Sequence, residues 1–189
     1  MTVVTPELRI LHAIRVAGWV SADRLGAWLP ATERTATIDD ESVLGNDSLF
    51  TATRTPRGEV YGLTALGRSE ASDRLAGLLD STRTATKPLL AEFESFDRRL
   101  KVVVTAFQRD RSDANARALV DFHGEVDELL ERIADSTPLW TAYPGRFRAA
   151  VDEIARQNWD FVASPLLDSY HTVWHFLHRD MRLVTEEAN

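Results

Sequence analysis

The stretch that most constrains the fold is FTATRTPRGEVYGLTALGR, at residues 50–68. Two short runs rich in threonine, valine and aromatic residues flank a Pro-Arg-Gly sequence, which is typical of a β hairpin with a tight turn. Leu-Thr then opens a helical pattern that contains Gly-Arg, so a helix follows the second strand directly. The sequence therefore predicts a two-stranded hairpin with an arginine near its tip, joined without a linker to a helix.

Three short helices are predicted before this hairpin. Residues 6–20 carry apolar side chains at helical spacing, with Thr5 as the N-cap and Gly18 just after the end. Residues 21–29 form a second amphipathic pattern, which a proline terminates. A third helix is expected at about residues 32–44. The N-terminal part is thus expected to be a small helical head that carries the hairpin.

The remainder of the chain is predicted to be helical. A helix at 64–82 follows the hairpin, and the polar residues 84–87 before Pro88 indicate a joint. We therefore expect a domain at 1–83 and a helical bundle at 84–189, which together make a mostly α fold. Periodic apolar positions place the bundle helices at about residues 88–108, 115–135, 147–154 and 165–184.

Composition excludes several classes of protein. Hydrophobic residues make up 44% of the 189 residues, which is enough to build an ordinary core. There is no cysteine, so a disulfide framework, a thiolate nucleophile and a zinc ribbon are all ruled out. No run approaches the roughly 18 apolar residues of a membrane span, and the first residues do not resemble a signal peptide. We therefore expect a cytoplasmic protein without a membrane partner.

The charge of the chain limits how it could bind nucleic acid. The 22 lysines and arginines are outnumbered by 29 acidic residues, which gives a net charge of −7. Strong nonspecific binding to DNA requires a positive surface against the phosphates, because affinity comes from counterion release. Any DNA-binding surface must therefore gather its arginines on one face.

The order of short helices followed by a hairpin resembles the winged helix-turn-helix proteins of the MarR and PadR type. That resemblance implies an N-terminal winged helix with a two-stranded wing, and a transcriptional regulator that binds double-stranded DNA. The recognition helix would present Arg34, Thr35 and Thr37 to the bases, while Arg54 and Arg57 of the wing would contact phosphates or the minor groove. Such proteins usually bind as dimers, so a homodimer is expected, with the C-terminal bundle as the dimerisation or effector domain.

A second resemblance covers most of the chain. The stretches LHAIRVAG at 11–18, GLTALGR at 62–68 and SYHTVWHFLHRD at 169–180 resemble an all-helical domain that follows a winged helix in proteins associated with pyruvate phosphate dikinases. The chain is too short to hold the dikinase domains, and it contains no glycine-rich phosphate loop. We therefore expect no enzymatic activity and no cofactor.

An acidic run favours a different function. Asp39, Asp40 and Glu41 are consecutive in the expected recognition helix, and phosphates repel carboxylates. The arginines of the hairpin would then be ordinary solvating charges. The alternative is an interaction or adaptor module that has lost DNA binding, and the resemblance suggests a phosphoenolpyruvate-using enzyme as its partner.

Three histidines follow one another along a single face of the last predicted helix. His171, His175 and His178 occupy positions i, i+4 and i+7, with Asp168 one turn earlier. Two histidines four residues apart can chelate a transition metal, so these four residues are a candidate metal or ligand site, and a metal-dependent enzyme or sensor is a third hypothesis. The alternative, which we favour, is that the stripe packs against another helix.

The C-terminal half is rich in aromatic residues, which have two interpretations. They could line a cavity for a small-molecule effector between helices. More often such residues form the core of a bundle. The residues concerned are Trp140, Tyr143, Trp159, Tyr170, Trp174 and Phe176.

Overall fold

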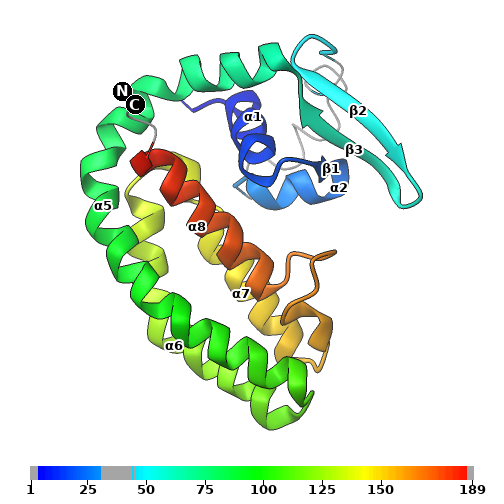
Figure 1. Cartoon of the computed structure of the whole chain (residues 1–189), viewed down its shortest axis with the longest axis vertical. Coiled ribbons are helices and arrows are strands. Elements are labelled where there is room, and N and C mark those ends of the chain that lie inside the picture. Colours follow the sequence, from blue (N-terminus) through cyan, green and yellow to red (C-terminus); the bar gives the residue numbers. More distant parts are fainter. Residues whose placement is uncertain (1–3, 31–43, 45, 187–189) are drawn as a thin grey trace. The chain divides into compact units, whose positions relative to one another are not determined.

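The computed structural model describes residues 4–30, 44 and 46–186, which form a mostly helical protein with a small antiparallel sheet (Figure 1). The chain divides into two compact units, Met1–Ser81 and Thr82–Asn189. Each unit is described by itself below. None of the described helices combines the length and the hydropathy that a bilayer span requires.

Helix α1 (Pro6–Ala17) has the ends that the sequence predicted. The Oγ1 atom of Thr5 accepts a hydrogen bond from the Leu8 N–H at 3.3 Å, which satisfies one of the free amides of the first turn. At the other end Gly18 has φ 84°, and its N–H donates to the Ile14 carbonyl at 2.7 Å. A glycine is favoured there because this backbone conformation is strained for other residues.

The second predicted helix is shorter than expected. It consists of α2 (Ala22–Leu25) followed by a 3₁₀ turn, η1 (Gly26–Trp28). Leu25 and Trp28 are buried, as their spacing predicted. The two residues before α2 form a strand, β1 (Val20–Ser21), which the sequence analysis missed because two residues are too few to show a periodic pattern.

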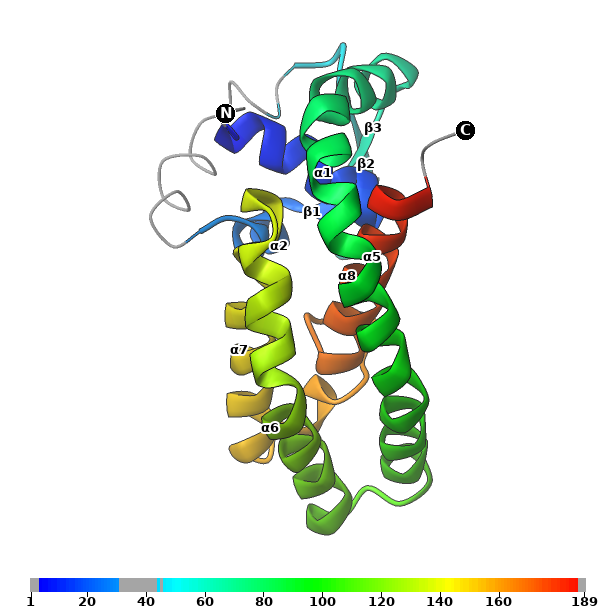
Figure 2. The ribbon, with the colours of Figure 1, turned by 90° about the vertical axis from the view of Figure 1, so that its left-hand side faces the viewer.

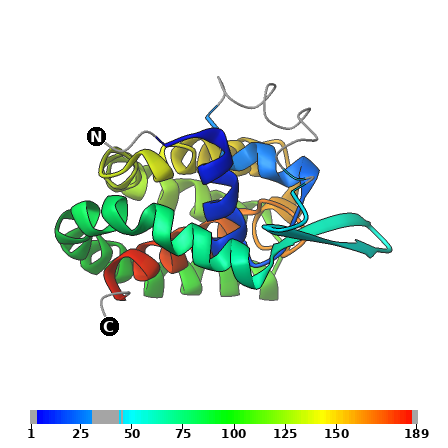
Figure 3. The ribbon, with the colours of Figure 1, turned by 90° about the horizontal axis from the view of Figure 1, so that it is seen from above.

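Strands β2 (Phe50–Thr55) and β3 (Gly58–Leu63) form the predicted hairpin, and β1 pairs with β3 to complete a three-stranded sheet of order β1-β3-β2. Phe50 is opposite Leu63 in the register, and both side chains are buried. Toward the turn the side chains become exposed, and the ribbon extends beyond α1 and α2 of the same unit (Figure 3). The hairpin is thus anchored at one end and presented to solvent at the other.

The GLTALGR stretch forms the junction between the hairpin and helix α5 (Ala65–Arg109). Thr64 caps the helix: its Oγ1 accepts from the Gly67 N–H at 3.0 Å, and its own N–H donates to the Leu49 carbonyl at 3.0 Å. A Cβ atom at Gly67 would lie only 2.1 Å from the Leu49 oxygen, so a glycine is required for this approach. Arg68 donates to the Leu63 carbonyl at 2.8 Å. The conspicuous residues of this stretch therefore have structural roles.

Helix α5 differs from the sequence prediction. We expected two helices with a polar joint at 84–87, but these residues are helical and Pro88 lies inside the helix. A proline at this position removes the amide that would bond to the Thr84 carbonyl. Thr84 is exposed, so water can satisfy that carbonyl, and Thr86 Oγ1 donates to the Thr82 carbonyl at 3.0 Å. The prediction of a non-helical joint at residues 84–87 is therefore wrong.

The second unit is a helical bundle. It contains the C-terminal part of α5 with α6 (Asp113–Asp135), α7 (Tyr143–Ala155) and α8 (Tyr170–Glu186), and Figure 2 shows α6 beside α7. Two 3₁₀ turns, η2 (Pro138–Trp140) and η3 (Trp159–Phe161), lie on either side of α7 in the chain. The last helix begins five residues later than the predicted start at 165.

Aromatic side chains fill the core of this bundle. The ring of Trp174 on α8 stacks on Phe93 of α5 at a centroid distance of 3.9 Å. The same indole contacts Phe122 of α6 at 5.6 Å and Phe147 of α7 at 6.2 Å. One residue of α8 thus joins all three other helices. The aromatic residues Trp140, Tyr143, Tyr170 and Trp174 are buried in the core, and Phe176 is half-buried.

Candidate functional site

The turn of the hairpin places an arginine at its tip. Pro56 and Arg57 connect the paired residues Thr55 and Gly58, so the loop has two residues. The Thr55 hydroxyl accepts from the Arg57 N–H at 3.2 Å and donates to the Gly58 carbonyl at 2.7 Å. Gly58 has φ 115°, a conformation that favours glycine. The backbone under Arg57 is therefore fixed by local bonds, while its side chain is exposed.

A second exposed arginine lies next to the turn. Arg54 is opposite Glu59 across the two strands. Within the described part of the chain, neither the Arg54 nor the Arg57 guanidinium makes a hydrogen bond or ion pair. Glu59 instead accepts from the Tyr61 hydroxyl at 2.7 Å. Both arginines thus keep their donors available for a partner, although one carboxylate lies close by.

The two faces of the hairpin differ in character. Side chains alternate along a strand, so Phe50 and Arg54 lie on the face that begins at the core, and Thr51, Thr53 and Thr55 lie on the other. The threonine face carries no charged residue. The hairpin therefore separates its arginines from an uncharged, exposed surface.

Three of the five residues that we predicted to bind DNA lie outside the described residues. These are Arg34, Thr35 and Thr37 of the expected recognition helix. The structure places the other two, Arg54 and Arg57, on one exposed hairpin, three residues apart.

The histidine stripe does form on α8, and the Asp168 carboxylate binds an arginine of α7. That carboxylate accepts from Arg146 Nε at 2.9 Å. His178 Nε2 lies 2.9 Å from Glu94 Oε1 on α5. Among the described residues, no group of three or more histidine and acidic side chains is arranged to hold a metal ion. His178 of the stripe contacts α5, as the packing interpretation predicts, whereas the side chain of His175 is exposed.

Two histidines of the bundle are partly desolvated. Burial lowers the pKa of His171, and the neighbouring His175 lowers it further. Burial also lowers the pKa of His123, against the opposing effect of Asp127. His123 Nδ1 on α6 lies 3.3 Å from the Tyr170 hydroxyl at the start of α8.

Polar contacts join α7 to α8 and to the residues just before it. The Tyr143 hydroxyl donates to Asp180 Oδ2 at 3.0 Å, and both residues are buried. Burial raises the pKa of Tyr143, and the charge of Asp180 adds to this shift. Arg146, one turn after Tyr143, binds Asp168. This network was not predicted, although Asp180 lies three residues after Leu177 and four before Val184, at a position of the apolar stripe of this helix.

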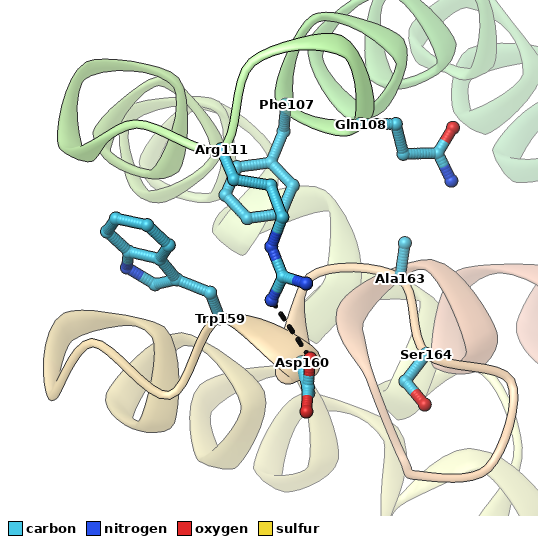
Figure 4. Close-up of a pocket in the computed structure, with 7 residues that line it drawn as sticks. All are labelled: Phe107, Gln108, Arg111, Trp159, Asp160, Ala163 and Ser164. Atoms are coloured by element: carbon cyan, nitrogen blue, oxygen red, sulfur yellow. Dashed lines mark hydrogen bonds and ion pairs between the residues drawn. The ribbon is translucent and has the colours of Figure 1, made fainter.

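A hollow of about 260 Å³ lies at the end of α5 against η3 (Figure 4). Arg111 reaches across it to Asp160, at 2.9 Å, with its guanidinium over the ring of Phe107. Trp159 meets Phe107 edge to face at 6.0 Å. Trp159 is the one predicted cavity aromatic that lines this hollow. The complete lining is Phe107, Gln108, Arg111, Trp159, Asp160, Ala163 and Ser164.

No family model, curated protein or solved structure matches this chain. A functional interpretation therefore depends on the geometry of the described residues. Among the described residues, exposed arginines without a hydrogen bond or ion pair lie, for example, on the hairpin (Arg54 and Arg57) and on the outer face of α8 (Arg179).

Proposed function

We propose that this protein is a DNA-binding transcriptional regulator, with a winged helix-turn-helix in the first unit and β2–β3 as its wing. The observation that carries the proposal is the exposed hairpin with Arg57 at its tip and Arg54 beside it, both without an intramolecular partner among the described residues. Wings of this kind contact phosphates or enter the minor groove.

The size of the expected electrostatic contribution follows from counterion release. Each phosphate that a cation neutralises contributes a slope of about −0.9 to the dependence of log K on log salt. If Arg54 and Arg57 each contact one phosphate, they account for a slope of roughly −1.8 per hairpin. A homodimer, which we also propose, carries two hairpins and would double this value.

The other parts of the proposal concern the recognition helix, the second unit and the location of the protein. Arg34, Thr35 and Thr37 would contact base edges from the recognition helix. The helical second unit would dimerise and bind an effector, whose differential affinity for two states would change DNA affinity. We place the protein in the cytoplasm, where it would meet its DNA.

DNA binding is tested with the full chain and a duplex from upstream of its gene, at several salt concentrations. We expect the Arg54→Ala, Arg57→Ala double variant to lose about tenfold or more in affinity and to show a shallower salt slope. The matched control is Arg109→Ala with Arg117→Ala, which removes two exposed charges from the second unit. Weak, salt-insensitive binding by the unmodified protein would contradict the proposal.

A substitution at Glu59 tests the same proposal, with an expected gain instead of a loss in DNA affinity. It lies opposite Arg54, and its carboxylate would face the same phosphates. Glu59→Gln keeps the side-chain size and removes the charge, so we expect tighter DNA binding. Glu59→Gln could leave the DNA affinity unchanged while the arginine variant weakens it. In that case the DNA contacts the tip of the hairpin and does not reach the face that carries Glu59.

The second candidate function is an adaptor that binds a protein and not DNA. The observation that favours it is Trp19, which is 53% exposed beside the uncharged threonine face of the sheet. Exposed tryptophans are enriched in the energetically dominant positions of protein interfaces. The net charge of −7 also disfavours DNA.

The adaptor hypothesis makes a separate prediction. A purified phosphoenolpyruvate-using dikinase should bind the full chain, and Trp19→Ala should weaken that binding without affecting DNA. Isothermal titration with both variants compares the two functions directly. Loss of DNA affinity in the arginine variant, with no dikinase binding, would exclude the adaptor.

A further inference from the structure

The outer face of α8 carries four basic side chains in one place. His175, His178, Arg179 and Arg182 occupy positions i, i+3, i+4 and i+7, so they share one side of the helix. Together with Leu183 they line a depression of about 280 Å³. In a chain with a net charge of −7, a local excess of positive groups is a specific feature of this surface.

A carboxylate of the neighbouring helix orients two of these groups. Glu94 Oε1 on α5 lies 2.9 Å from His178 Nε2 and accepts from Arg182 Nε at 3.2 Å. The hydrogen bond from His178 is the largest cause that lowers the pKa of Glu94, so this carboxylate remains charged. Glu94 thus holds the two side chains at the edge of the depression and neutralises part of their charge.

The other two basic groups have no such partner. Among the described residues, neither Arg179 nor His175 makes a hydrogen bond or an ion pair, and both side chains are exposed. Of the other arginines of this unit, Arg99, Arg132 and Arg148 each pair with a carboxylate, whereas the exposed Arg98, Arg109 and Arg117 make no such bond among the described residues. The depression on α8 groups the guanidinium groups of Arg179 and Arg182 with two imidazoles that can also donate, next to the carboxylate of Glu94.

We propose that this depression binds the phosphoryl group of a small phosphorylated compound. A phosphate dianion has several acceptor oxygens that point in different directions, and four side chains that can donate hydrogen bonds line this depression. Guanidinium groups suit this geometry because each presents several N–H donors in a rigid fork. The side chain of Leu183 offers an apolar contact to the organic part of the ligand.

The site lies within the second unit, and it depends on residues that the hairpin does not use. Its failure would not affect the proposal of DNA binding, and loss of DNA binding would not remove the phosphate site.

The direct test is titration of the full chain with inorganic phosphate and phenyl phosphate at constant ionic strength. We expect Arg179→Gln to weaken the binding of both by about tenfold, because a charge-assisted hydrogen bond is lost. Arg109→Gln removes the same charge from an exposed position elsewhere in the bundle and should leave binding unchanged. Equal loss in both variants, or no loss in Arg179→Gln, overturns the proposal.

Glu94→Gln distinguishes a phosphate site from a structural ion-pair cluster. Removal of the competing carboxylate should tighten phosphate binding severalfold, whereas a structural cluster would lose thermal stability without any gain in affinity. Acetate at the same concentration tests the class of anion, and binding as tight as that of phosphate would overturn the choice of ligand. Vesicles that contain phosphatidic acid test a lipid source, and binding to vesicles but not to phenyl phosphate would also overturn it.

Discussion

The six-membered ring of Trp19 rests against the backbone of Gly62: a Cβ atom at residue 62 would lie 2.9 Å from three of its carbon atoms. This contact holds an indole on the surface of β3 although the side chain is 53% exposed. A large exposed aromatic group is thereby kept in one position beside the hairpin. The glycine at residue 62, which belongs to the GLTALGR stretch, is explained by this contact.

The Trp19 contact predicts a specific effect of Gly62→Ala. The added methyl group must displace the indole, so the Trp19 N–H resonance should shift, with a loss of about 1 kcal/mol in the free energy of unfolding. Gly77→Ala is the matched control, because an added Cβ at Gly77 meets nothing within 4 Å. That exposed helical position should gain about 0.5–1 kcal/mol. An unchanged Trp19 resonance in Gly62→Ala would refute the contact.

Gly67 should tolerate substitution less well than Gly62. A Cβ at Gly67 would lie 2.1 Å from a backbone oxygen of Leu49, which cannot swing aside as an exposed side chain can. We expect Gly67→Ala to cost about 3 kcal/mol or more, since the hairpin must separate from the first turn of α5. Chemical denaturation measures this loss. A cost equal to that of Gly62→Ala would show that the junction is less rigid than described.

The two buried tyrosines predict loss of stability at alkaline pH. Burial raises the pKa of Tyr143 and of Tyr170, with further contributions from Asp180 and Asp127 respectively. The folded state therefore keeps both protons above about pH 10, where the unfolded chain releases them. Each retained proton should lower the free energy of unfolding by ~1.4 kcal/mol per pH unit above that value.

The variant Tyr170→Phe tests whether Tyr170 contributes to the loss of stability at alkaline pH. It removes one of the two titrating groups, so the slope of stability against pH above about 10 should fall by roughly half of the tyrosine contribution. Denaturant unfolding at several alkaline pH values gives both slopes. The same slope in Tyr170→Phe and in the unmodified protein would exclude a role for this residue.

The partly buried histidines predict the opposite dependence at acid pH. Burial lowers the pKa of His123 and of His171 below the unfolded value of about 6.5. Stability is therefore complete above about pH 6.5 and decreases as the pH falls toward the folded pKa values, because only the unfolded chain takes up these protons. Ring-proton NMR titration measures both groups. A ring that titrates above 6.5 in the folded protein would reverse the expected sign.

Features of the fold that depend on neighbours in the sequence were predictable. Thr5 and Gly18 define the ends of α1 through bonds to residues three or four positions away, so their roles were predictable. The turn at Pro56 and Arg57 depends on its immediate neighbours in the same way. The predicted joint before Pro88 was wrong because the cost of a proline inside a helix depends on whether the carbonyl that loses its hydrogen bond is exposed to water.

The amino-acid sequence by itself determined the hairpin, the single histidine face of α8 and the helical character of most of the described chain, though not that α5 is continuous, because periodicity and turn chemistry act between residues that are close in the chain. Only the tertiary structure decided which partners those side chains meet. Glu94 is 84 residues from His178, and Asp168 is 22 residues from Arg146. The packing of helices brings such groups together, and no local pattern records their distances.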